Sequence, residues 1–202
     1  MNADPNDATA AFTEYAASKL WIASHLTQFL GLALLAVALL ALARTVDEGS
    51  SAAWAKVSVW GAAISVATGA ALQAVDGVAL KVMVDRWAAA TGTDQAMIFE
   101  AAFAVRQIEL GLASLWSLVF GLTVAVLGMA LVLSARYAKW LGWWAVLGGL
   151  GISTAGIAFA YTGFSPLAMN ISTPASIILL AWAIAVGVIM LRRSLVPASL
   201  AN

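Results

Sequence analysis

The amino-acid sequence predicts an all-α integral membrane protein, a helical bundle with five transmembrane helices and a helical extension between the second and the third. Hydrophobic residues make up 63% of the 202 residues and charged residues only 10%, whereas soluble domains average about 45–50% and about 25%. Five uncharged, apolar runs are long enough to cross a bilayer, which takes roughly 20 residues. Because open strands in lipid would leave backbone groups without partners, each run is expected to be a helix.

The first two spans are expected at residues 20–43 and 57–80. The first is uninterrupted by charge and ends before Arg44. The second is apolar over most of its length but carries the polar residues Gln73 and Asp76 near its end. It is therefore the span in which a polar site is most readily recognised.

The remaining spans are expected at residues 110–135, 140–163 and 174–191. Thr173 and Pro174 fit the N-cap and first turn of the last helix, since threonine caps helices and proline is favoured at their first position. The segment that precedes this helix is short and uncharged. We expect it to be a loop that lies in the interface or folds over a cavity.

Residues 81–109 carry a dense mixture of acidic and basic side chains. Their apolar residues recur at helical spacing, and a Thr-Gly-Thr-Asp segment interrupts the pattern. We therefore expect the second and third helices to extend beyond the membrane and to meet in a hairpin whose tip lies near Gly92. On this reading residues 1–202 form one membrane domain.

Basic residues at the helix ends predict the orientation, because cytoplasmic segments carry an excess of Lys and Arg. Five spans place six of these residues on one side and four on the other. This indicates an N-terminus outside and a C-terminus in the cytoplasm. The N-terminal segment has Asp4, Asp7 and Glu14 before its first basic residue, Lys19, unlike the basic leader of a secretory signal. The first helix is expected to be retained.

The charge balance and the absence of cysteine exclude several function classes. Ten basic residues offset ten acidic ones, so no positive field is available to bind nucleic acid. Without cysteine, disulfides, thiolate nucleophiles, iron–sulfur clusters and cysteine-ligated zinc are excluded. A lone histidine, His25, cannot supply a two-histidine metal or haem site within one chain. We expect no cofactor and no metal, and we assign no catalytic residue.

Six polar residues from three spans are expected at a similar depth, near the outer membrane surface. They are His25, Gln28, Gln73, Asp76, Arg106 and Glu109. Trp21 shares the helix face of His25, four residues away. Ionisable groups within spans are costly and persist where partners or water surround them. The cluster therefore predicts an outward-facing ligand-binding pocket, or alternatively a structural network whose members only satisfy one another.

Three functions remain open at this point. The first is a non-enzymatic membrane protein that binds or passes a small polar or amphipathic ligand, or protons, at this pocket. The second is a structural or accessory subunit that docks a partner through the charged hairpin. The third is a lipid-active enzyme in which Asp76 or Glu109 acts as a base and Arg106 clamps an anion. That enzyme would need an opening to lipid between the first and third spans.

Small residues on the expected third and fourth helices, among them Gly121, Gly128 and Gly149, permit close approach of helix backbones in lipid. We expect the bilayer as the main partner, with association into homo-oligomers or with other membrane subunits.

Two segments carry a family resemblance: His25-Leu-Thr-Gln-Phe29 and Gln73-Ala-Val-Asp-Gly77. With the alanine-rich helices, they resemble a small bacterial multi-pass family known only as a domain of unknown function (DUF4386-like). The resemblance covers most of the chain. It implies a location in the bacterial cytoplasmic (inner) membrane and supplies no catalytic residues to carry over.

Overall fold

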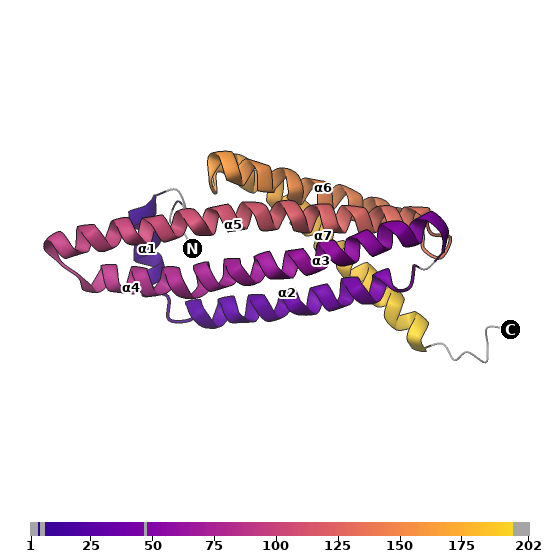
Figure 1. Cartoon of the computed structure of the whole chain (residues 1–202), viewed down its shortest axis with the longest axis horizontal. Helices are drawn as coiled ribbons and strands as arrows, with labels where there is room; N and C mark the ends of the chain where they lie inside the picture. The colour runs from indigo at the N-terminus through magenta and orange to yellow at the C-terminus, as the bar shows by residue number, and fades with distance from the viewer. Residues whose placement is uncertain (1–3, 5–6, 47, 196–202) are drawn as a thin grey trace.

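The computed structural model describes residues 4, 7–46 and 48–195, and this part of the chain is helical without strands. Figure 1 shows the helices running mostly along the long axis of the molecule. In chain order they are α1 (Ala8–Ala17), α2 (Trp21–Ala43), α3 (Gly49–Ala74), a π-helix η1 (Val75–Leu80), α4 (Lys81–Ala89), α5 (Gly92–Leu133), α6 (Lys139–Thr162) and α7 (Pro166–Leu195).

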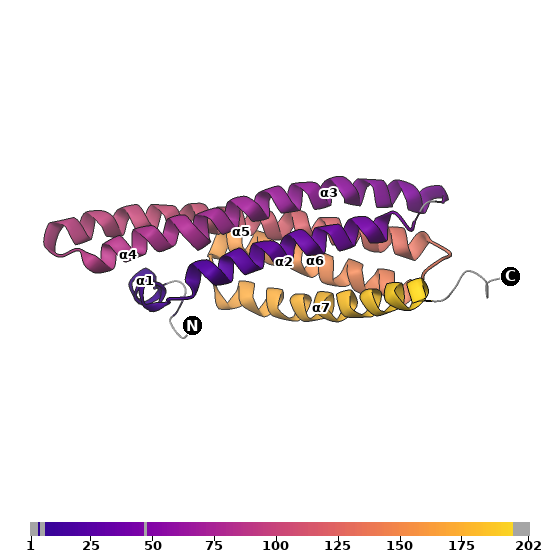
Figure 2. The ribbon, with the colours of Figure 1, turned by 90° about the horizontal axis from the view of Figure 1, so that it is seen from below.

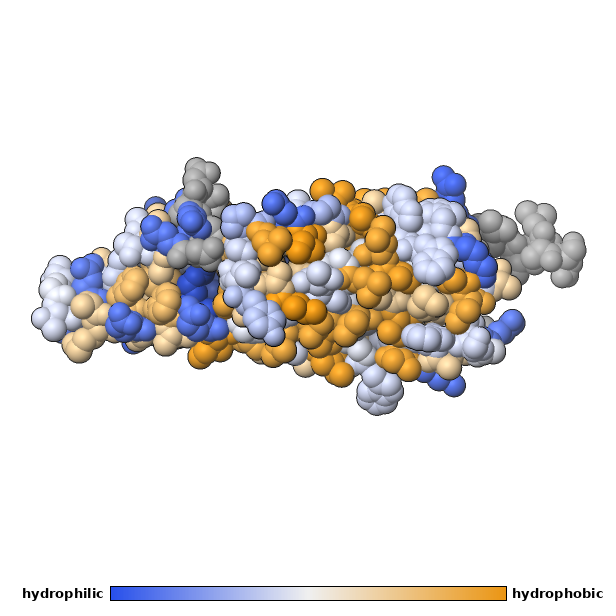
Figure 3. All heavy atoms as spheres, turned by 90° about the horizontal axis from the view of Figure 1, so that it is seen from above, coloured by the Kyte–Doolittle hydropathy of each residue, from blue (hydrophilic) through white to orange (hydrophobic). Residues whose placement is uncertain are grey.

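Five helices of the described chain are long and apolar enough to cross a membrane. They are α2, α5, α6, α7 and the continuous helical run that α3, η1 and α4 form together. Hydrophobic side chains gather over the middle of the molecule, and hydrophilic ones gather toward its two ends (Figure 3). The predicted all-α class and the multi-pass membrane character are confirmed.

The second and third spans continue into a helical hairpin, as the sequence predicted. The run Gly49–Ala89 has 41 residues and Gly92–Leu133 has 42. At 1.5 Å per residue each is about 60 Å long, roughly twice the hydrocarbon thickness of a bilayer. Ala90 and Thr91 join them at the tip, visible at the left of Figure 1. We call this the hairpin end of the molecule.

Helix α1 was not predicted. Asp7 caps it by accepting a hydrogen bond from the Ala10 amide at 3.0 Å. Phe12 is fully buried and its ring packs against the rings of Trp87 and Phe99. A search for long apolar runs does not detect a helix of 10 residues. Figure 2 shows α1 beside α4, where it crosses the hairpin.

Helices α5 and α6 approach closely through glycine. The Ser114 hydroxyl donates a hydrogen bond to the Gly156 carbonyl at 2.8 Å. A Cβ atom at Gly156 would lie 2.7 Å from the Leu118 amide nitrogen, a distance that real Cβ atoms do not reach. The small residues therefore allow two helix backbones of the same chain, those of α5 and α6, to approach closely.

The start of the last span was predicted wrongly. Helix α7 begins at Pro166, not at residue 174, and Pro174 lies inside it. The Ser165 hydroxyl accepts a hydrogen bond from the Ala168 amide at 3.3 Å, so Ser165 and Pro166 hold the N-cap and first-turn positions. Transmembrane helices tolerate an internal proline, which makes proline a weak start signal there.

The expected loop before this helix is correspondingly shorter. Helix α6 ends at Thr162, and Gly163 follows in the left-handed region at φ 65°, which glycine adopts without strain. Only residues 163–165 separate the two helices. The second span also begins earlier than expected, at Gly49 instead of residue 57.

Candidate functional site

The centre of the candidate site is a contact between α2 and the π-helix η1. His25 Nε2 lies 3.0 Å from Asp76 Oδ2, and His25 Nδ1 lies 2.7 Å from the Trp21 carbonyl oxygen. The Trp21 indole N–H donates to the backbone carbonyl of Asp76 at 3.0 Å. Side chain and backbone of Asp76 therefore both bind α2.

These contacts determine where protons lie. The Trp21 carbonyl can only accept, so Nδ1 of His25 carries a proton and donates it. One further proton then lies between His25 Nε2 and Asp76 Oδ2. Whichever atom holds it, imidazole and carboxyl group together have no net charge, and loss of this proton leaves the pair negative.

The π-helix gives Asp76 its position. Such wide turns are rare and frequently occur at functional sites. Gly77, the residue after Asp76, faces the imidazole, and a Cβ atom there would lie 2.5 Å from His25 Cβ. The Gln73-Ala-Val-Asp-Gly77 segment thus combines a wide turn with a residue small enough to admit His25.

A second contact pair lies on α5. Arg106 Nη1 donates to Glu109 Oε2 at 3.2 Å and to the Tyr15 hydroxyl at 2.9 Å. Its guanidinium group lies over the rings of Tyr15 and Phe164, 5.4 and 5.6 Å from their centres. Arg106 is 6% exposed and Glu109 5%. The positive charge is therefore enclosed between two aromatic rings and a carboxyl group.

Tyr15 connects this pair to the N-terminal helix α1. Burial raises the pKa of its phenol above the ordinary value of 10.0, although Arg106 opposes the shift. The hydroxyl keeps its proton at neutral pH and accepts the hydrogen bond from Arg106.

An amide pair completes the set. The Gln73 side-chain N–H donates to Gln28 Oε1 at 3.3 Å. Gln73 Oε1 is buried and has no hydrogen-bond partner within the described part of the chain. This oxygen is an acceptor that a ligand could use.

Four of these residues line a cavity of about 490 Å³ between α2, α3 and α5, within the size range of small-molecule sites. We call it the polar cavity. Its polar wall holds Gln28, Gln73, Asp76 and Glu109, and its apolar wall includes Leu32, Leu35, Trp116 and Phe164. His25 and Arg106 are not among the residues that line it.

The structure thus brings all six residues of the sequence hypothesis into one region, but in two layers. Four face the polar cavity, and His25 and Arg106 stand behind the two carboxyl groups. Sequence reasoning missed Tyr15, whose ring lies against Arg106, and Trp116, which lines the polar cavity. It expected the segment that contains Phe164 to lie in the interface or to fold over a cavity. Tyr15 could have been indicated only by its spacing from Phe12, which places both residues on one face of a short helix.

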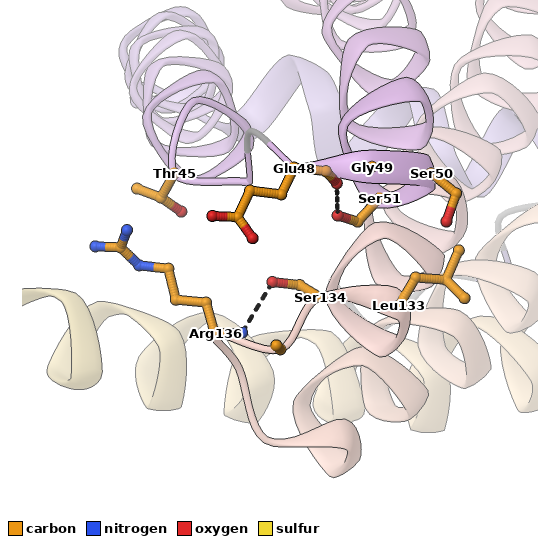
Figure 4. Close-up of a pocket in the computed structure, with 9 residues that line it drawn as sticks. Thr45, Glu48, Gly49, Ser50, Ser51, Leu133, Ser134 and Arg136 are labelled. Carbon is orange, nitrogen blue, oxygen red and sulfur yellow. Dashed lines mark hydrogen bonds between the residues drawn. The ribbon is translucent and has the colours of Figure 1, made fainter.

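A second cavity, of about 530 Å³, lies at the opposite end of the molecule, between the α2–α3 connection and the end of α5. Arg136, Glu48 and Thr45 line it, and their side chains point toward the same space (Figure 4). Glu48 and Arg136 are exposed. This cavity is an open depression between connecting segments.

Among the residues that the structure describes, no three His, Cys, Asp or Glu side chains are grouped in a way that could hold a metal ion.

Comparison with known proteins gives one match. A family model described as a domain of unknown function, DUF4386, matches residues 2–187. None of the curated proteins and none of the solved structures matches the chain.

Proposed function

We propose that this chain, which belongs to the DUF4386 family of unknown function, is a membrane protein that binds a small ligand through a protonated amine in the polar cavity. One observation carries the proposal. The carboxyl groups of Asp76 and Glu109 reach the same cavity from two different helices, whereas the cation Arg106 and the imidazole His25 lie behind them. The polar wall therefore consists of two carboxyl groups and two amide side chains, and it has no cationic side chain.

A primary ammonium group fits this wall. It carries three N–H donors and no acceptor. Asp76, Glu109 and the unpartnered oxygen of Gln73 supply three acceptors. Hydrogen bonds between an ammonium and a carboxylate are about twice as strong as neutral ones. An anionic ligand would instead meet two carboxyl groups.

The location and orientation are part of the proposal. With Lys and Arg in excess at the end opposite the hairpin, the hairpin end faces the outside of a bacterial inner membrane. The polar cavity then lies in the outer half of the membrane. It collects its ligand from the outer leaflet or from the external solution.

The geometry disfavours a lipid-active enzyme with Arg106 as anion clamp. The polar cavity is lined by side chains of α2 and α5, the two helices between which such an enzyme requires an opening. However, the guanidinium group of Arg106 is covered by Tyr15 and Phe164. It cannot contact a substrate in the cavity without displacing them.

Docking of a partner through the hairpin finds less support than ligand binding. Phe12 of α1 already covers the apolar side of the hairpin by packing on Trp87 and Phe99. The exposed charged residues of the hairpin are Asp85, Arg86, Asp94 and Glu100, whereas Lys81, Arg106 and Glu109 are buried. The exposed charges alone do not indicate a partner.

Binding of butylamine, a short primary amine, tests the proposal. The purified protein should unfold at a higher temperature as butylamine is added, because a ligand that binds the folded state stabilises it. Butanol, which lacks the ammonium group, should have no such effect. Asp76→Asn should weaken butylamine binding about tenfold or more, since a hydrogen bond to a charged group contributes about 1.5–3 kcal/mol.

The chain offers a matched pair of control variants on α5. Glu109→Gln changes a residue of the polar cavity, and Glu100→Gln changes an exposed residue of the same helix. We expect weaker butylamine binding for the first only. Folded Asp76→Asn and Glu109→Gln proteins that bind butylamine as the unchanged protein does would refute the proposal.

A further inference from the structure

We propose that the natural ligand is a single-chain amphiphile, a primary amine whose alkyl chain lies in an apolar channel that continues from the polar cavity. This inference rests on the proposed function. It adds the second half of the binding site and the route by which the ligand enters.

The channel has a volume of about 390 Å³ and lies between α2, α5, α6 and α7. Its walls are almost entirely hydrocarbon and aromatic. Leu35 and Leu39 line it from α2, Phe120 and Val124 from α5, and Leu179 and Trp182 from α7. No acidic or basic side chain of the described residues lines it.

The channel and the polar cavity are neighbours with a common wall. Leu35, Trp116, Ser117 and Phe159 line both. These residues form the junction at which the acceptor-lined wall gives way to an apolar one. An occupant that satisfies both parts must have a polar donor at one end and a hydrocarbon chain at the other.

The combined site runs along the helices. On α5 it extends from Glu109 to Val124, about 22 Å at 1.5 Å per residue. This exceeds half of the roughly 30 Å hydrocarbon thickness of a bilayer. The ligand is therefore an elongated molecule that lies parallel to the lipid chains.

The channel also meets the lipid-facing surface. Leu180 of α7 lines it and is 64% exposed, and Ser176 beside it is exposed as well. An amphiphile can thus enter sideways from the bilayer, with its chain first sharing the lipid environment and its ammonium group sliding toward Asp76. Lateral entry avoids the transfer of the alkyl chain through water.

The test compares ligands in protein reconstituted into phosphatidylcholine nanodiscs. Hexadecylamine should bind at least tenfold more tightly than butylamine after correction for uptake by empty nanodiscs. Hexadecanol and palmitate have the same chain without the ammonium group, and they should bind at least tenfold more weakly than hexadecylamine. Hexadecyltrimethylammonium keeps the charge but has no N–H donor, and it should also bind more weakly.

Variants that fill the channel separate it from the polar cavity. Ser176→Phe and Ala183→Phe each place a ring in the channel. Both should weaken hexadecylamine binding and leave butylamine binding unchanged. Thr154→Phe introduces the same ring at an exposed position of α6 and should change neither. Two channel variants are used so that one remains available if the other does not fold.

Contact between the alkyl chain of the ligand and the channel can be measured by tryptophan fluorescence. Hexadecylamine with a bromine atom on its chain should quench tryptophan fluorescence. The Trp116→Phe/Trp182→Phe protein should lose most of this quenching when the two proteins are compared at equal amounts of bound amine. Equal binding of hexadecylamine and butylamine would overturn the inference and leave the proposed function standing. Equal binding of all hexadecyl compounds would show that the ammonium group is not recognised, and it would overturn the inference and the proposed function together. Failure of both amines to bind would refute the proposed function itself.

Discussion

Asp76 is the residue on which the site depends most. Its carboxyl group contacts the imidazole of His25, and its backbone carbonyl accepts from Trp21. It is also one of the two acidic residues that line the polar cavity. A ligand that contacts Asp76 therefore competes with a contact that joins two helices.

The first prediction concerns Gly77. In Gly77→Ala the new Cβ atom would meet His25 Cβ at 2.5 Å and Cγ at 3.0 Å. His25 cannot retreat, because it is held by Trp21 and Asp76. We expect a loss of about 1–3 kcal/mol in the free energy of unfolding, the usual cost of overpacking, measured by denaturation in detergent.

Gly111→Ala is the matched control. Nothing lies within 4 Å of a Cβ atom there, and alanine stabilises a helix interior by up to about 1 kcal/mol over glycine. Gly111→Ala should therefore be neutral or stabilising. Equal stability of the two variants would contradict the close contact at Gly77.

The second prediction concerns pH. An ammonium group beside Asp76 disfavours the proton shared with His25, so amine binding should release it. Hexadecylamine itself remains protonated at neutral pH, as a lysine side chain does. Its affinity should therefore rise from acidic to neutral pH, by up to about tenfold per pH unit for one released proton, in binding titrations at fixed ionic strength.

Other titratable or charged groups near this region are Glu109 and Arg106 from α5 and Tyr15 from α1. His25→Gln removes the imidazole and keeps these three. The pH dependence should then become clearly smaller. An unchanged dependence would assign the released proton to Glu109 and contradict our account of the His25–Asp76 pair.

At this scale the sequence predicted which side chains converge, because ionisable groups in apolar helices require partners. It could not predict the two layers of the site. Whether Arg106 faces the cavity or lies behind Glu109 depends on the rings of Tyr15 and Phe164, which come from α1 and from the α6–α7 connection. The π-helix that orients Asp76 has no signal in the apolar pattern.

At the scale of elements, α1 supports the site from outside the spans. It packs on the hairpin through Phe12 and supplies Tyr15 to Arg106. The Lys81 ammonium adds a hydrogen bond to the Ala16 carbonyl at 3.2 Å. Helix α1 is thus a strap across α4 and α5.

The third prediction tests this strap. Phe12→Ala removes a fully buried ring, a change that costs about 3–5 kcal/mol in protein cores. We expect α1 to detach. Amide hydrogen exchange in Ala8–Ala17 should then become rapid, while exchange in the part of α5 that follows Gly111 stays slow. Slow exchange in α1 of the variant would show that α1 is held by other contacts.

The bounds of the elements could be predicted only in part. Apolar length identified five spans because bilayer thickness sets it. The start of α7 was wrong because Pro174 was taken for a first-turn proline, whereas Ser165 and Pro166 offer the same signal eight residues earlier. Helix α1 was missed because its burial comes from the hairpin, not from lipid.

At the scale of the whole molecule, the polar cavity lies toward the hairpin end, between helices that are long and apolar enough to cross a membrane. Two of these helices continue into the charged hairpin, and residues of α6 and α7 line the apolar channel. Hydropathy alone predicted the bundle. The pairing of α5 with α6 depends on glycine contacts such as that of Gly156 with Leu118.

The fourth prediction concerns orientation. The chain has no cysteine, so a single introduced cysteine is the one labelling site. Gln95→Cys at the hairpin should react with an impermeant maleimide in intact cells. Ser50→Cys, at the opposite end, should react only after the membrane is opened. The reverse pattern would place the hairpin in the cytoplasm.

The most direct measurement uses the one histidine of the chain. Nitrogen NMR of protein with isotope-labelled histidine gives the imidazole signals of His25 alone. Saturating hexadecylamine should shift the Nε2 signal, which reports the contact with Asp76, and the shift should be absent in Asp76→Asn. An imidazole spectrum that hexadecylamine leaves unchanged, although the amine is bound, would contradict the claim that the ligand binds at the carboxyl group of Asp76.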